Sequence, residues 1–131
     1  QAWGTLPQTI PTHFDAAGNA DGWGPKIMIL LLPVISVVMI PLMLILRHFP
    51  WISNTPIKIT NKNAAYQYGL IVRLLGMLAC VISLLFLALV YDTISIAGGG
   101  VSLLGAWFMP TFILPIFGTL LWYFISAIRG R

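Results

Sequence analysis

Three long runs of apolar residues dominate the chain. They occupy residues 27–46, 74–91 and 107–128, and each run is free of Asp, Glu, Lys and Arg. A helix of about 20 apolar residues spans the hydrocarbon core of a bilayer. Only a helix satisfies its own backbone hydrogen bonds there without closing into a barrel. The pattern therefore predicts an all-α integral membrane protein with three transmembrane helices.

The segments between these runs complete one predicted membrane domain, residues 1–131. The second helix is expected to begin before the membrane, because Thr60 or Asn61 can serve as its N-cap and no proline follows before the apolar run. The predicted segments are an outer loop at 1–26, a helix at 27–46, a cytoplasmic connector at 47–60, a long helix at 61–92, an outer loop at 93–106 and a helix at 107–128.

Composition supports the same class of protein. Hydrophobic residues make up 59% of the 131-residue chain and charged residues only 8%. Ten charges are too few to cover a water-exposed surface of this size. The net charge of +4 comes from scattered cations and not from a basic stripe, which argues against nucleic-acid binding. The expected partner is the lipid bilayer.

Charge asymmetry predicts the orientation. Six of the seven cations lie in two places, the segment between the first two apolar runs and the C-terminal tail: Arg47, Lys58, Lys62, Arg73, Arg129 and Arg131. The positive-inside rule assigns these segments to the cytoplasm. The N-terminal segment is then outside and the C-terminus inside. Since the chain begins with Gln1, we expect either a cleaved signal peptide or a missing fourth helix at the N-terminus.

The outer segment is expected to be an ordered loop. Its prolines exclude a continuous helix, and Gly18-Asn19 and Asp21-Gly22 are turn dipeptides. Its apolar side chains are expected to pack against the ends of the transmembrane helices. These side chains are Leu6, Ile10, Phe14 and Trp23.

The outer face also carries the candidate site. The candidate ligand-binding residues are His13, Asp15, Asp21, Trp23, Lys26 and Asp92. An imidazole with carboxylates can ligate a divalent cation or act as a general acid and base. Alternatively, the acids hydrogen-bond their own turns. We expect Lys26 to pair with Asp15, Asp21 or Asp92, with His13 in the same pocket. We predict no catalytic residue, metal or cofactor.

The run LP..IPTHF...G..DGWG.K at residues 6–26 resembles the signature of a bacterial membrane family named for its domain of unknown function 1648. That domain also forms the first half of Sdp-type toxin-immunity proteins. FPWISNTPIKITNKNAAYQY is similar to the cytoplasmic connector of short members, and AWFMPTFILPIFG to their last helix. The resemblance implies a multi-pass protein of the bacterial inner membrane, with one more helix before the LP motif.

These observations favour a non-catalytic membrane protein that recognises a peptide, lipid or partner protein at its outer face, as an immunity-like or signalling-like protein or an accessory subunit. A small transporter component is the alternative, although no charged residue lies at the middle of a predicted span. A third hypothesis is a metal-dependent hydrolase at the membrane surface that uses His13 and Asp15.

Overall fold

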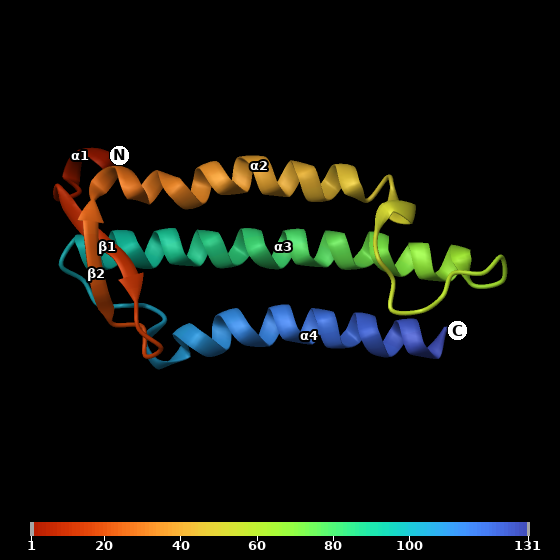
Figure 1. Cartoon of the computed structure of the whole chain (residues 1–131). Coiled ribbons are helices and arrows are strands. Elements are labelled where there is room, and N and C mark those ends of the chain that lie inside the picture. The colour runs from red at the N-terminus through yellow and green to blue at the C-terminus, as the bar shows by residue number, and fades with distance from the viewer. Residues whose placement is uncertain (1, 131) are drawn as a thin grey trace.

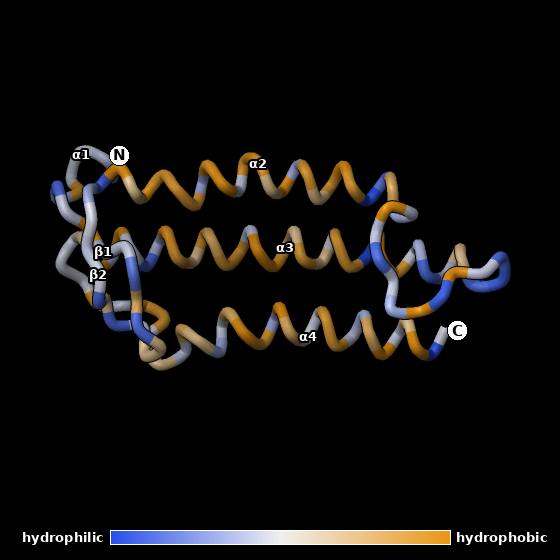
Figure 2. Tube along the Cα trace, viewed as in Figure 1, coloured by the Kyte–Doolittle hydropathy of each residue, from blue (hydrophilic) through white to orange (hydrophobic). Residues whose placement is uncertain are grey.

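Three long helices lie side by side in the computed structural model, which describes residues 2–130 (Figure 1). They are α2 (Leu31–Leu46), α3 (Ala64–Ala97) and α4 (Phe108–Arg129). Together with the turns that precede α2 and α4, each is long and apolar enough to cross a membrane. Figure 2 shows hydrophobic residues along the middle of the helices and polar residues toward both ends. This confirms the prediction of a helical, multi-pass membrane protein.

The central helix of the bundle is α3, which contacts α2 on one side and α4 on the other (Figure 1). Few side chains are buried between the helices, and α2 buries none at all. In water such a bundle would expose large apolar side chains along its whole length. In a bilayer the same side chains meet lipid, so outward-facing hydrophobic residues are compatible with a stable fold.

The predicted outer loop is a β-hairpin. A short helix, α1 (Ala2–Thr5), precedes β1 (Thr9–Phe14) and β2 (Ala20–Pro25), which pair antiparallel with bulges around His13. The strand signal lies in the sequence TIPTHF, where β-branched and aromatic residues are frequent and glycine-rich segments follow. Pro11 is compatible with β1 because both strands of a two-stranded sheet are edge strands.

The helix bounds differ from the predicted ones at several ends. A 3-10 turn, η1 (Lys26–Leu30), precedes α2, so the first apolar run is only partly α-helical. The second helix begins at Ala64 rather than 61, because the side chains of Thr60 and Asn63 close a separate turn before it. Asn63, and not Thr60 or Asn61, occupies the N-cap position.

The second helix also continues beyond Asp92. It ends at Ala97, where three consecutive glycines follow and Gly99 adopts a positive φ of 84°. Glycine at this position is the usual stop signal of a helix. Asp92 is therefore a residue inside α3, and the loop between α3 and α4 is shorter than predicted.

The bundle has two chemically different ends. We call the hairpin, η1 and the α3–α4 loop, which contains η3 (Gly105–Trp107), the hairpin end. We call residues 47–63, which contain η2 (Pro50–Ile52), together with the end of α4, the connector end. A small buried core lies near the connector end, formed by Leu70, Ile71, Tyr123 and Ala127. The hairpin end has its own buried residues, Leu6, Ile10 and Pro11.

Candidate functional site

The hairpin is docked on the ends of the helices. Ile10 is only 1% exposed, Leu6 is buried, and Phe14 contacts Phe108 of α4 with ring centroids 5.6 Å apart. These contacts confirm three of the four predicted packing residues. Trp23 is 58% exposed, so its predicted packing against the helix ends is wrong. In β2 it lies opposite Pro11, and its side chain remains on the outer surface of the hairpin.

Three glycines of the motif lie where a side chain would meet neighbouring atoms of the α3–α4 loop or of β1. Gly18 has a φ of 81°, and a Cβ there would lie 2.7 Å from the carbonyl oxygen of Gly105. A Cβ at Gly22 would lie 2.8 Å from Cβ of His13, and one at Gly24 would lie 3.0 Å from Cγ2 of Thr12. The motif glycines therefore keep space for the β1 side chains and for the α3–α4 loop. This is a structural reason for the pattern G..DGWG.

His13 and Asp21 form the only ion pair among residues 2–130. His13 Nδ1 lies 2.5 Å from Asp21 Oδ1, and the two side chains are 73% and 47% exposed. An exposed pair contributes about 0–1 kcal/mol to stability. The contact with Asp21 is made by Nδ1 and orients the imidazole. The other ring nitrogen, Nε2, takes no part in this contact. His13 and Asp21 are the two candidate residues that the structure brings together.

Asp15 serves the turn of the hairpin. Its Oδ1 accepts hydrogen bonds from the backbone N–H groups of Ala17 and Asn19, and its Oδ2 accepts one from the Asn19 side-chain amide. These bonds, with the Asn19 side chain as the largest contribution, hold the pKa of Asp15 below its usual value of 3.8. Both oxygens of Asp15 thus accept hydrogen bonds from within this turn.

Asp92 serves the α3–α4 loop. Its carboxylate is fully buried and accepts hydrogen bonds from Ser102 Oγ at 2.9 Å and from the Leu103 backbone N–H at 2.5 Å. Ser102 Oγ in turn accepts a hydrogen bond from the Gly105 N–H. Asp92 thus organises the loop on which the turn of the hairpin rests. It does not face an open site.

Lys26 does not form the predicted ion pair with an acid. Its Nζ lies 5.1 Å from the ring centroid of Trp3, which is a cation–π contact between η1 and α1. The predicted pairing of Lys26 with Asp15, Asp21 or Asp92 is therefore wrong, whereas His13 and Asp21 do lie together. Among residues 2–130, no group of three or more His, Cys, Asp or Glu side chains lies close enough together to hold a metal ion.

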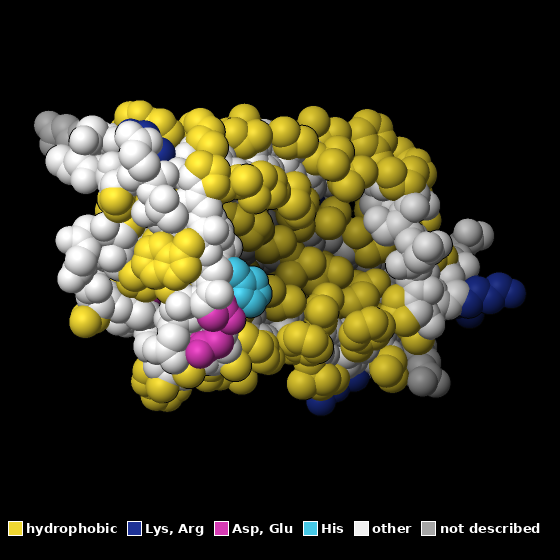
Figure 3. All heavy atoms as spheres, turned by 60° about the vertical axis from the view of Figure 1, so that its left-hand side comes forward, with side chains coloured by type: hydrophobic (Ala, Val, Ile, Leu, Met, Phe, Trp, Pro, Cys, Tyr) yellow, Lys and Arg dark blue, Asp and Glu magenta, His cyan; other side chains and the backbone are white. Residues whose placement is uncertain are grey.

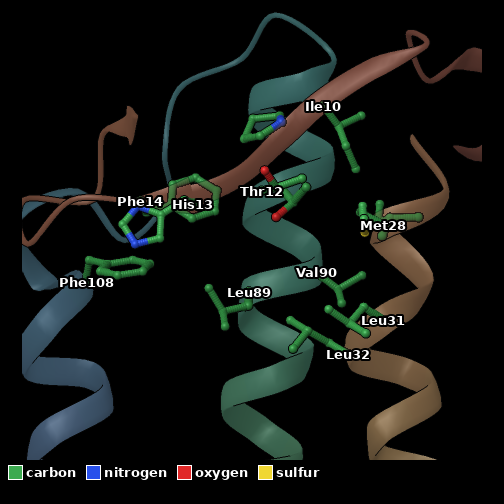
Figure 4. Close-up of a pocket in the computed structure, with 13 residues that line it drawn as sticks. Ile10, Thr12, His13, Phe14, Met28, Leu31, Leu32, Leu89, Val90 and Phe108 are labelled. Carbon is green, nitrogen blue, oxygen red and sulfur yellow. The ribbon is translucent and has the colours of Figure 1, made fainter. Parts of the chain in front are cut away.

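A cavity of about 360 Å³ lies beneath β1, between the ends of the three long helices (Figure 4). Its apolar walls come from β1, η1 and the three long helices, and include Met28, Leu32, Val90 and Phe108. In the space-filling view of Figure 3, a histidine beside acidic side chains marks the edge of a hollow with hydrophobic walls. His13, which is paired with Asp21, lines the cavity. Within residues 2–130, the only other polar side chains that line it are those of Thr12 and Thr93.

Most of these lining residues were not among the predicted site residues. Thr12 lies between Ile10 and Phe14 at alternate positions of β1, so a strand interpretation of TIPTHF would have placed all three on the docking face. Val90 and Thr93 lie one turn apart on α3. In and beside the apolar run of this helix, a residue that lines a cavity cannot be told by type from one that faces lipid. The cavity depends on where the hairpin docks, so a local sequence pattern does not reveal it.

Comparison with known proteins supports the motif. Residues 1–37 match the model of a family described as a domain of unknown function (DUF1648). The matched segment contains the hairpin, η1 and the first part of α2. It therefore includes β1, which covers the cavity, and the lining residues of η1 and α2. The resemblance noted from the sequence is thus confirmed for this segment. Searches of curated proteins and of solved structures found no match to the chain.

Proposed function

We propose that this protein is a non-catalytic integral membrane protein that recognises a membrane amphiphile at its hairpin end. The amphiphile is a lipid-like molecule with one alkyl chain in the cavity and a polar head near His13. The observation that carries this proposal is the apolar cavity beneath β1, with its few polar groups on one side.

The chemistry of the walls supports an amphiphile. Among the described residues, no carboxylate, lysine or arginine lines the cavity, so its body suits hydrocarbon. The hydroxyls of Thr12 and Thr93 and the imidazole of His13 supply hydrogen-bonding groups. Mostly apolar pockets with a few placed polar groups are typical of small-molecule sites, and about 300 Å³ is near their lower limit. The volume therefore suits one alkyl chain better than a folded partner.

The position of the cavity supports the same conclusion. It lies where α2, α3 and α4 meet the polar hairpin, at one end of the apolar spans (Figures 2 and 4). In a bilayer this is the depth at which the head of a lipid changes to its chain. A ligand that enters from the membrane would already have the required orientation, which lowers the entropic cost of binding.

A photocrosslinking experiment tests the proposal. The full chain in lipid nanodiscs is irradiated with a monoacyl lipid that carries a diazirine in its chain, and adducts are mapped by mass spectrometry. Val90→Trp fills the cavity, whereas Val37→Trp is a matched control, because Val37 is 74% exposed on α2. Adducts on Met28, Leu89 and Phe108 are expected to fall in the first variant only.

Two results would overturn this assignment. If both variants give the same adducts, the cavity holds no amphiphile and the probe reports only the lipid surroundings. If an apolar peptide displaces the probe where unlabelled lipids do not, the ligand is a peptide. The second result would keep the cavity as a recognition site and reject the lipid.

We further propose that the hairpin end is outside and the connector end is in the cytoplasm of a bacterial cell, on the basis of the charge asymmetry. After replacement of Cys80, single cysteines are placed at Asn19, Gly99 and Asn61 and labelled from outside intact cells. The residues at 19 and 99 should react and the residue at 61 should not. Labelling at 61 alone would invert the orientation.

A further inference from the structure

A second feature of the molecule lies at the connector end, where Arg47 contacts α3. Arg47 is the C-cap of α2, directly after the first apolar span. A Cβ added to Gly76 would lie 3.4 Å from Cζ of Arg47, 3.5 Å from Nη1 and 3.6 Å from Nε. Because Cζ is the nearest of these atoms, the flat face of the guanidinium and not its N–H edge meets Gly76. The glycine therefore provides the space in which the guanidinium lies.

This guanidinium is only partly satisfied by the protein. Its Nε is buried and has no hydrogen-bond partner within residues 2–130. The described acids, Asp15, Asp21 and Asp92, belong to the hairpin end, and the only described ion pair joins His13 to Asp21. The 16 residues of α2 separate Arg47 from that end by roughly 24 Å. The Debye length at physiological salt is about 8 Å, so these acids do not neutralise Arg47.

A second cation lies about one turn from Gly76 on α3. Arg73 is three residues before Gly76 on α3, and residues at this spacing share a helix face. Arg73 is exposed, and no described acid pairs with it. Two arginines thus face the same region at the end of the apolar spans. Arg47 offers a fork of N–H groups that matches a phosphate in geometry as well as in charge.

The geometry points to a binding site for the phosphate of an anionic phospholipid at the connector end, formed by Arg47 lying on Gly76 and assisted by Arg73. The phosphate accepts hydrogen bonds from the N–H edge of Arg47, and the lipid chains lie along the exposed apolar surface of α2. This supplies an anion at an end where residues 2–130 provide no acidic side chain. The site is independent of the cavity beneath β1.

The test measures lipid retention by native mass spectrometry of the full chain in mild detergent, with phosphatidylglycerol or phosphatidylcholine added. The wild type is expected to retain phosphatidylglycerol in preference to phosphatidylcholine. Arg47→Gln should lower this retention about tenfold, since hydrogen bonds to charged groups are the strong ones. Lys62→Gln is the matched control, because it removes one exposed charge from the same end. Equal effects of the two substitutions would overturn the site.

A variant that keeps both arginines distinguishes a specific phosphate site from general electrostatic attraction of anionic lipid. Gly76→Leu pushes the guanidinium off α3, whereas a Cβ alone, as in Gly76→Ala, makes an ordinary contact. Gly76→Leu should therefore lose retention and Gly76→Ala should keep it. If all variants that keep the charge bind equally, the arginines act only as diffuse charges and the proposal fails. Because this arm does not remove Arg47, it decides the question even if Arg47→Gln is unstable.

Competition with inorganic phosphate identifies the source of the anion. A phospholipid anchored by its chains should remain bound in excess inorganic phosphate. Full displacement by inorganic phosphate would assign the site to a free anion and overturn the lipid assignment. All arms of this experiment leave the hairpin end unchanged, so their failure would not affect the proposal for the cavity.

Discussion

The two ends of the bundle use their charged residues in opposite ways. At the hairpin end the acids are engaged in the structure: Asp15 closes a turn, Asp92 holds a loop and Asp21 orients His13. At the connector end Arg47 and Arg73 have no described acid partner, and neutral groups join the elements instead. The acids therefore shape the protein, whereas these arginines remain available to bind anions.

A similar contrast separates the contacts that join the elements at each end. The hairpin docks on the helix ends through buried apolar side chains, and its glycines allow neighbouring groups to approach closely. At the connector end, buried Gln67 of α3 donates hydrogen bonds to the backbone carbonyls of Ala127 and Gly130, at 3.0 Å each. These are carbonyls at the end of α4 that the helix itself leaves unpaired. One end is joined mainly by packing and the other also by long-range hydrogen bonds.

The largest effect is expected at the apolar contact of the hairpin. Ile10→Ala should lower the free energy of unfolding by about 2–5 kcal/mol, because it leaves a cavity at a side chain that is 1% exposed. Denaturant titration of the purified chain in mild detergent measures this. Trp23→Ala, in the opposite strand, is the control and should change stability by less than about 0.5 kcal/mol. Equal losses would show that Trp23 is also part of the hairpin core.

Asp92 should come next. Asp92→Ala leaves the Ser102 hydroxyl and the Leu103 N–H without their acceptor, which costs roughly 1–3 kcal/mol. Asp21→Ala, which removes an exposed acid at the same end, should cost about 1 kcal/mol or less. The same titration compares the two. A stable Asp92→Ala protein would contradict the structural role and return Asp92 to the list of binding residues.

At the connector end the effects should be smaller. Gln67→Met keeps the volume and loses two hydrogen bonds, but it also removes the buried Oε1 that has no partner. We expect a net loss of about 1 kcal/mol. Tyr66→Phe removes one hydrogen bond to the Ser126 carbonyl, and the loss should be half as large or less. Hydrogen exchange at the last turn of α4 would report both changes locally.

His13 should separate binding from stability. His13→Ala removes only an exposed ion pair, so the melting temperature should change little. If the cavity is the recognition site, crosslinking of the monoacyl lipid probe and a cell-based activity should both fall. A fall in activity fully explained by a lower melting temperature would contradict the recognition role. Asp15→Ala, measured alongside, should reduce activity only through stability, because Asp15 belongs to the turn.

The smallest effect is the pH dependence of the turn. Since the folded pKa of Asp15 is below 3.8, the carboxylate stabilises the turn above this pH, and the contribution disappears as the pH falls through the folded value. The amide protons of Ala17 and Asn19, followed by NMR below pH 4, should report the loss. In Asp15→Asn this titration should be absent. An unchanged pH profile in that variant would assign the titration to another group.

Several features of the fold could be predicted from local sequence. The apolar runs predicted the spans, and Leu6 and Ile10 predicted the docking of the outer segment. The prolines of the outer segment favour a loop, although TIPTHF also carries the pattern of a strand. The glycines at 98–100 mark the end of α3 better than Asp92 does, the charge that follows the apolar run.

The candidate site was harder to predict. The sequence shows that His13, Asp15, Asp21 and Asp92 share one end of the protein, but not which of them face each other. Asp15 finds its partners within four residues, whereas Asp92 finds its partners ten and eleven residues away in a loop. The pairing of a polar group depends on which donors the folded chain holds at hydrogen-bond distance. Charge type alone does not decide this.

What the sequence by itself determined are properties that depend on sums over neighbouring residues: the spans, from the transfer of apolar side chains to lipid, and the separation of acids from most cations along the chain. Only the tertiary structure decided the contacts between distant residues. The cavity needs β1 to lie over α3, and the guanidinium of Arg47 lies against Gly76, a residue 29 positions further along the chain. Such sites require van der Waals and hydrogen-bond distances that only the packed helices and hairpin set.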